Sequence, residues 1–167
     1  YKFHLITTYR DACVGVVDLD TSVWNFLFAM DAPEKQAVTR DFFSRAQEYE
    51  LYISDVVFAE FDGANVPKRD QLYDLVRQHK PLVLEFDSEI AALAQVYIDD
   101  GIIPAKKMDD ARHIAYATYY ELDVLLSWNY KHLANLFKRK RIHILNLQRG
   151  YTKPLELITP MEVMKND

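Results

Sequence analysis

The stretch VVDLDTSVW, residues 16–24, constrains the fold more than any other part of the sequence. Its apolar, β-branched start predicts a buried strand, and the Thr-Ser pair after Asp20 is typical of a helix that begins there. A strand that ends in an acid and leads directly into a helix places a carboxylate at the carboxyl edge of a parallel sheet. Ligands bind at that edge in α/β proteins, so Asp20 is the first candidate site residue.

Strand and helix patterns alternate along the rest of the chain. Predicted strands cover residues 14–19, 51–53, 82–86, 124–127 and 142–147. Predicted helices cover residues 22–29, 33–50, 55–60, 67–78, 88–101, 108–120 and 132–138, and a last one begins at Thr159-Pro160. Such alternation predicts an α/β domain of three α/β/α layers with a central, mostly parallel sheet.

Length and composition favour a single folded domain. Half of the 167 residues are apolar and 27% are charged, which is typical of a globular protein rather than a disordered one. We expect residues 14–167 to form the domain and residues 1–13 to be an N-terminal extension or a remnant of cloning. The net charge of -5 argues against nucleic-acid binding by bulk attraction alone, although a local basic patch remains compatible with it.

Cysteine usage and hydropathy bear on the compartment. Cys13 is the single cysteine, so no internal disulfide or thiolate cluster is expected, as in a reducing cytosol. No apolar run approaches the ~18 residues that span a membrane. The start also lacks the pattern of a signal peptide. We therefore expect a cytoplasmic protein with no membrane partner.

Three later segments each bring another oxygen ligand to the expected sheet edge. Glu60 lies in the apolar context VVFAEF, where an unpaired acid is costly unless it meets a cation or strong donors. Asp110 begins a helix of small residues, and Asn129 follows a strand. Three carboxylates in one pocket are unfavourable without a divalent cation, and oxygen ligands suit Mg²⁺ or Mn²⁺. We predict that catalysis and metal binding fall to Asp20, Glu60, Asp110 and Asn129.

Neighbouring side chains are expected to support this site or to extend it. The residues expected to support the metal ligands are Asp18, Thr21, Ser127 and Asp109. The residues expected to hold an RNA backbone are Lys131, Lys138, Arg139, Lys140 and Arg141. Each group also has an ordinary interpretation, because acids cap helices and a basic run can be a solvated helix end. His113 and His132 are more often packed or surface groups than metal ligands.

In their order along the chain, these segments resemble the motifs of the PIN-domain nucleases, and among them the VapC-type toxins. LDTSVW resembles the first motif, with its Asp at Asp20, and VVFAEF resembles the second, with its acid at Glu60. DDARHIAYAT resembles the third, with its Asp at Asp110. SWNYKHL is similar to a subgroup form of the fourth, in which Asn129 stands where Asp is common. The likeness runs from Val16 to Val163 and includes the closing NLQRGY and TPMEV segments.

This resemblance implies a Mg²⁺- or Mn²⁺-dependent endoribonuclease, usually a homodimer, that a cognate antitoxin protein inhibits. The chain departs from the family pattern at two positions. Asn129 leaves the site with one negative charge fewer than the four-acid form, which bears on a second metal. Asp18 stands at a strand position where the family more often has an apolar residue, and strand alternation puts it on the same face as Asp20.

Two other functions fit parts of the pattern. VVDLDT also resembles the opening motif of a haloacid-dehalogenase-like phosphatase, with Asp18 as nucleophile and Asp20 as acid/base. That alternative leaves Glu60 unexplained and expects a paired acid after Ser127 rather than before it. The other alternative is a non-catalytic PIN-like domain that binds RNA or a protein, although a pure binder gains nothing from a repulsive acidic pocket.

Overall fold

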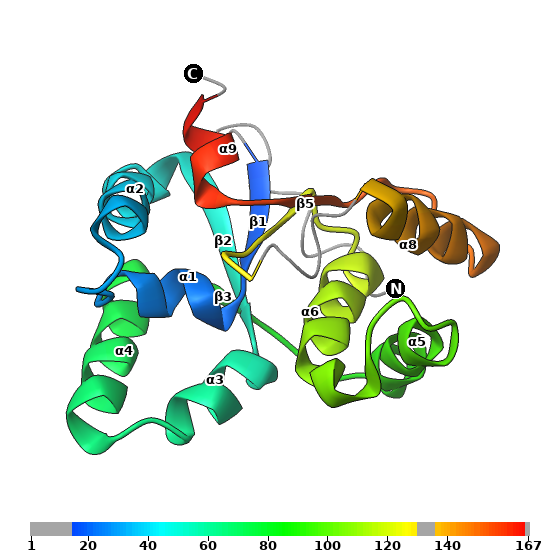
Figure 1. The fold of residues 1–167 in the computed structure, drawn as a ribbon, viewed down its shortest axis with the longest axis horizontal. Coiled ribbons are helices and arrows are strands. Elements are labelled where there is room, and N and C mark those ends of the chain that lie inside the picture. The colour runs from blue at the N-terminus through cyan, green and yellow to red at the C-terminus, as the bar shows by residue number, and fades with distance from the viewer. Residues whose placement is uncertain (1–14, 130–135, 166–167) are drawn as a thin grey trace.

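A computed structural model describes residues 15–129 and 136–165. Within them, a parallel sheet of five strands has the order β3-β2-β1-β4-β5 and carries helices on both faces (Figure 1). The strands are β1 (Gly15–Leu19), β2 (Tyr49–Ser54), β3 (Leu82–Leu84), β4 (Val124–Leu126) and β5 (Glu156–Ile158). The structure confirms the expected three-layer α/β/α architecture, and all four pairings of neighbouring strands are parallel.

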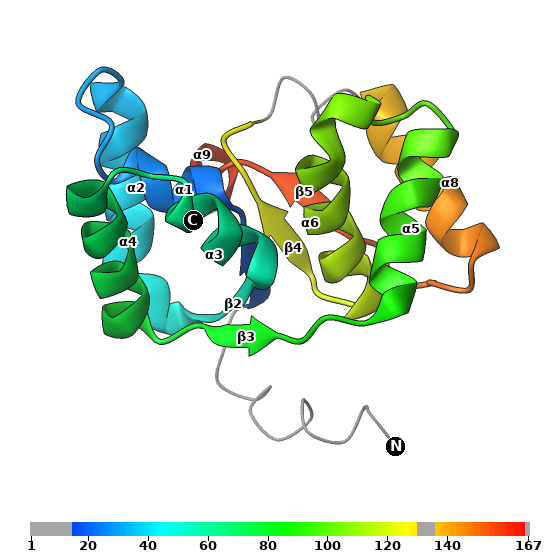
Figure 2. The same ribbon diagram turned by 90° about the horizontal axis from the view of Figure 1, so that it is seen from below.

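Two helical layers enclose the sheet (Figures 1 and 2). One layer holds α1 (Thr21–Phe26), α2 (Pro33–Ser44), α4 (Val66–His79) and α9 (Pro160–Lys165). The other holds α5 (Ser88–Asp99), α6 (Met108–Tyr119) and α8 (Leu136–Gln148). Helix α3 (Asp55–Asp62) contributes side chains to the cores on both sides. Short 3-10 turns, η1 (Ala46–Glu48) and η2 (Ala105–Lys107), precede β2 and α6.

Strand alternation divides the apolar side chains between two cores. In β1, Val16 packs in the core under α5 and α6, whereas Val17 and Leu19 pack in the core under α1 and α2. Asp18 has the same parity as Val16, so it belongs to the α6 face of the sheet. A buried acid therefore interrupts the apolar lining beneath α6.

The direction in which successive strands are added to the sheet reverses between β1 and β4. The chain adds β2 and β3 on one side of β1 and then returns to add β4 and β5 on the other. Crevices for ligands form at the carboxyl ends of strands at such a switch point. Asp20 directly follows β1, and Ser127 directly follows β4, so both lie there.

The last predicted strand was wrong. Residues 142–147 belong to α8, and the fifth strand is Glu156–Ile158. Within α8, Ile142 and Asn146 are buried at helical spacing, whereas Ile144 and Leu147 are exposed. The alternating apolar residues therefore lie on the buried and exposed faces of a helix rather than on the two faces of a strand.

Other element boundaries shifted, and some predictions lie outside the described residues. The predicted helix 33–50 ends at Ser44, and its last residues form η1 and the start of β2. Of the predicted helix 132–138, only residues from Leu136 onward are described, and they begin α8. The predicted extension, residues 1–13, and Lys131 also lie outside the described ranges. None of the described helices has the length and apolarity needed to cross a membrane.

Candidate acidic site at the carboxyl edge of the sheet

Hydrogen bonds hold Asp20 in place at the end of β1. Its backbone N–H donates to the carbonyl of Leu126 in β4 at 3.1 Å. Its Oδ1 caps α1 by accepting from the backbone N–H of Ser22 at 2.9 Å, and it also accepts from the Ser22 hydroxyl. Its Oδ2 accepts from the Ser127 hydroxyl. Burial raises the pKa of this carboxyl, while His113 and the serine hydrogen bonds oppose the rise.

The two serines also order the turn after β4. Ser22 Oγ accepts from the backbone N–H of Trp128 at 2.8 Å, and Ser127 Oγ accepts from that of Asn129 at 3.0 Å. Both serines are buried. The Asn129 backbone is therefore linked to Asp20 through one hydroxyl, while the Asn129 side chain is exposed.

Glu60 on α3 contacts His113 on α6. The His113 Nε2 lies 3.4 Å from Glu60 Oε1. The side chain of His113 is only 4% exposed, whereas that of Glu60 is 36% exposed. Burial lowers the pKa of His113, but the bond to Glu60 and the charges of Asp20 and Asp18 outweigh burial and raise it to about 8. The imidazole therefore carries a positive charge at neutral pH.

Asp110 lies in the first turn of α6 and is buried. Burial raises its pKa; Lys107 and His113 lower it, and Asp20 and Glu60 raise it further. The carboxylates of Asp20 and Glu60 are therefore both close enough to act on that of Asp110, as expected for side chains that share one edge of the sheet.

Asp18 is completely buried. Neither of its carboxylate oxygens has a hydrogen-bond partner in the described part of the chain. Burial raises the pKa of Asp18 to about 7; His113 and the backbone of Leu19 oppose the rise, and Asp20 adds to it. A phosphoryl-accepting nucleophile must touch its substrate, so this burial disfavours the phosphatase alternative.

Thr21 and Asp109, which were also expected to support the metal ligands, differ in burial. Thr21 is buried, and its hydroxyl has no partner within residues 15–129 and 136–165. Asp109 is exposed and lies 3.7 Å from Arg112, which also lies 3.3 Å from Asp55. Asp109 therefore belongs to a surface ion-pair cluster rather than to the surroundings of Asp20.

The basic run lies in the first half of α8 rather than at a helix end. Arg139 lies 3.9 Å from Glu162 of α9, and Arg141 pairs with the Asp100 carboxylate and its carbonyl. Lys138 is half-buried and Lys140 is exposed, and neither forms an ion pair with another described residue. The run is therefore divided between contacts within the chain and free lysines, and its contact with RNA stays a prediction.

The donor set of the acidic group suits a hard divalent cation. It consists of carboxylate oxygens and one amide, and Asp110 Oδ2 is a buried acceptor without a donor among the described residues. Over the same residues, no three His, Cys, Asp or Glu side chains are grouped closely enough to hold a metal ion. The type of donor thus fits Mg²⁺ or Mn²⁺, whereas the spacing of these side chains does not form a ready metal site. Ligation by Asp20, Glu60, Asp110 and Asn129 stays a prediction.

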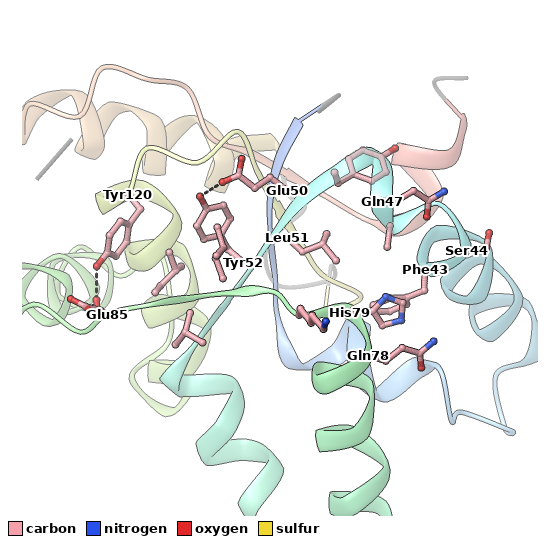
Figure 3. A pocket seen from close by; sticks show the side chains of 16 residues that line it. Phe43, Ser44, Gln47, Glu50, Leu51, Tyr52, Gln78, His79, Glu85 and Tyr120 are labelled. Carbon is pink, nitrogen blue, oxygen red and sulfur yellow. Dashed lines mark hydrogen bonds between the residues drawn. The ribbon is translucent and has the colours of Figure 1, made fainter. Parts of the chain in front are cut away.

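A separate hollow of about 1160 Å³ lies over β2 and β3 (Figure 3). Its lining includes Phe43, Tyr52, His79 and Val83, and Tyr52 donates a hydrogen bond to Glu50 at its wall. None of the candidate site residues lines it. The acidic group and this hollow are therefore distinct places on the molecule.

Sequence reasoning missed two side chains that the structure places in the acidic group. Ser22 was read only as the start of a helix, and His113 was set aside as a packed or surface histidine. A signal was present for His113, because it follows Asp110 by three residues and so shares its helix face. For Ser22, a hydroxyl two residues after a capping acid was the only signal.

Comparisons with known proteins give likenesses to solved structures alone. No protein-family model matches the chain, and no curated protein matches it. A crystal structure of VapBC2 from Rickettsia felis bound to a DNA fragment from their promoter has a similar chain, with a TM-score of 0.57 and 14% identity. The match covers 86% of this chain and 98% of that one. At this identity the likeness shows the fold alone, and the fold shared with that toxin–antitoxin structure is the PIN-like α/β fold.

Proposed function

We propose that this chain is a Mg²⁺- or Mn²⁺-dependent endoribonuclease and the toxin of a type II toxin–antitoxin pair. One observation carries the proposal: the carboxylates of Asp20 and Glu60 lie close enough to that of Asp110 to raise its pKa, at the switch point of a PIN-like sheet. The likeness to a chain of a VapBC2 structure supports it. A homodimer that acts in the cytoplasm is part of the same proposal.

The residues of the site would divide the work. Asp20, Glu60, Asp110 and Asn129 would hold the cation, which supplies positive charge against the phosphate and activates the attacking water. Asp20 offers the most rigid carboxylate, because Ser22 and Ser127 bind both of its oxygens. Glu60 is the most exposed of the three acids, so it would be the one most accessible to solvent and to a substrate.

RNA binding would depend on a local patch, because the chain as a whole is acidic. Lys138 and Lys140 are the residues of the basic run on α8 without an ion pair among the described residues. They would contact the phosphate backbone, together with the predicted contact at Lys131. Arg139 and Arg141 would serve mainly to hold α8 against Glu162 and Asp100.

The experiment is an RNA cleavage assay on the purified chain with Mg²⁺, Mn²⁺ or EDTA. We expect cleavage with either metal and none with EDTA, and Glu60→Gln should lose most of the activity. RNA binding without cleavage in any metal would support the non-catalytic alternative. Hydrolysis of small phosphomonoesters, lost in Asp18→Asn, would support the phosphatase alternative.

Substitution of Asn129 tests the charge of the site. An amide offers an oxygen to a cation but adds no charge, so Asn129→Asp should tighten Mn²⁺ binding, chiefly at any second position. The Asn129 side chain is exposed, so the substitution should leave the free energy of unfolding nearly unchanged. Calorimetric titration with Mn²⁺ measures the effect, with Asn129→Ala as the control that should weaken binding. An affinity that neither variant alters would remove Asn129 from the ligand set.

An antitoxin is expected to compete with the metal. Three neighbouring acids invite an Arg from a partner, because its guanidinium can bond two carboxylates at once. VapBC2 of Rickettsia felis is a complex of this kind of pair, bound to promoter DNA. We expect inhibition by the C-terminal segment of the cognate antitoxin to weaken as Mn²⁺ rises. An inhibition constant indifferent to Mn²⁺ would show that the partner blocks another surface.

A further inference from the structure

We propose that His113 is a positioning residue for Glu60, whose carboxylate it holds toward Asp20 and Asp110 from the buried side of α6. The inference deepens the proposed nuclease function and rests on it for its consequence in catalysis. It assigns His113 a role that the sequence motifs do not give it.

The geometry makes His113 the rigid member of the pair. Its side chain is 4% exposed on the buried face of α6, so the imidazole has little room to rotate. Glu60 is 36% exposed and has three rotatable side-chain bonds. A flexible exposed carboxylate loses rotamer freedom when it binds a ligand, and a contact that restricts it beforehand reduces that cost.

The contact uses only one oxygen of Glu60. His113 Nε2 lies 3.4 Å from Oε1, and Oε2 has no hydrogen-bond partner among the described residues. His113 Nδ1 is buried without a hydrogen-bond partner among the same residues. The Nε2–H group thus donates to the Glu60 carboxylate, both in the neutral Nε2–H tautomer and in the imidazolium cation. The second oxygen stays available to a cation or to a substrate proton.

Other contacts fix α3 against α6 without His113. The Tyr116 hydroxyl donates to Asp55 Oδ1 at 2.6 Å, and Arg112 lies 3.3 Å from Asp55 Oδ2. Asp55 is the first residue of α3, and Arg112 and Tyr116 flank His113 on α6. Because these contacts hold the two helices together, loss of the His113 side chain should free Glu60 without displacing α3.

The test compares His113→Gln with His113→Leu. A Gln amide can place an N–H close to the position of Nε2, whereas Leu fills similar volume without a donor. We expect Leu to lower kcat for RNA cleavage by ~10–100-fold with little change in KM, and Gln to restore most of the loss. Mn²⁺ affinity should follow the same order.

A second measurement needs neither metal nor substrate. In metal-free protein, the NMR shift of the Glu60 carboxyl carbon should move in the Leu variant and return toward the wild-type value in the Gln variant. Tyr116→Phe is the matched control, because it removes a helix-clamping bond and should move the Asp55 signal rather than that of Glu60.

The outcomes separate this inference from the proposed function. A wild-type chain that cleaves no RNA, yet shows the Glu60 shift changes, would overturn the nuclease and retain the contact. Active wild-type protein with an equally active Leu variant and an unmoved Glu60 signal would overturn the positioning role. Equal losses in the Gln and Leu variants would do the same, because they would reflect packing alone.

Discussion

The variant Asp20→Asn is expected to lose metal-dependent RNA cleavage and yet to melt no lower than the wild type. The loss follows because Asp20 is the carboxylate whose two oxygens are bound in place at the switch point, and an amide supplies no charge to a cation. We expect cleavage to fall to the level of a sample with EDTA. Gel assays with Mn²⁺ and thermal melting with EDTA measure the two effects.

The unchanged or raised melting temperature has an electrostatic cause. Burial raises the pKa of Asp20 above its unfolded value of 3.8, so the ionised carboxylate destabilises the folded state at neutral pH. An Asn of the same shape removes that penalty and can still accept from Ser22 and meet the Ser127 hydroxyl. The control Asp31→Asn, an exposed acid between α1 and α2, should alter neither property. Full cleavage by the Asp20 variant would remove this residue from the site.

The fold was largely predictable because its main signals are local. Each strand from β1 to β3 is followed within a few residues by a helix start, and the repeated alternation is enough to predict a layered parallel sheet. The region after Asn129 was not predictable in this way. Ile142, Ile144 and Leu147 fit a strand as well as a helix, and only packing against the rest of the chain selects which of them is buried.

Strand β5 was not predicted, because its sequence also lacks a local signal. It is three residues long, and only Leu157 is buried. A strand this short has no periodicity to detect, and it exists because β4 offers a parallel partner, with Leu125 opposite Leu157. Tertiary pairing therefore decided an element that the local sequence leaves open.

The candidate site was predictable in its acids but not in what surrounds them. Asp20 could be found because it directly follows a strand, and strand parity predicts that Asp18 shares a face with it. The hydrogen bond from Ser127 to Asp20 joins residues 107 positions apart, and the one between His113 and Glu60 joins residues 53 apart. Such distances in sequence leave no local pattern.

The largest effect on stability is expected for Asp18→Asn. The pKa of Asp18 rises from 3.8 to about 7 on folding, because the carboxyl is wholly buried without a hydrogen-bond donor among the described residues. A shift of about three units corresponds to about 4 kcal/mol between the two protonation states. The folded state thus holds the Asp18 proton more tightly than the unfolded state does.

The sign of this shift determines the pH window. For a carboxyl with a raised folded pKa, the free energy of unfolding falls as the pH rises from about 4 to about 7, and the loss then stays constant. Protonated His113 stabilises the folded state, because its pKa rises from 6.5 to about 8 on folding. This contribution to the free energy of unfolding is lost at higher pH, as the pH rises from about 6.5 to about 8. The wild type should therefore lose stability over both windows, and the Asn variant should lose the penalty of the first.

Urea unfolding at pH 5 and pH 8, both with EDTA, tests this prediction. The Asp18→Asn variant should exceed the wild type by a margin that grows with pH toward about 4 kcal/mol. An equal margin at both pH values would show that packing, not charge, sets the difference. Cleavage should fall by ~10–100-fold, because Asp18 lies behind Asp20 and acts on the site only through its charge and its neighbours. Packing does not explain why an acid stands at position 18, since an apolar side chain would fill the same place beside Val16 without the cost of a buried charge. A role of Asp18 in the neighbouring acidic site explains it better.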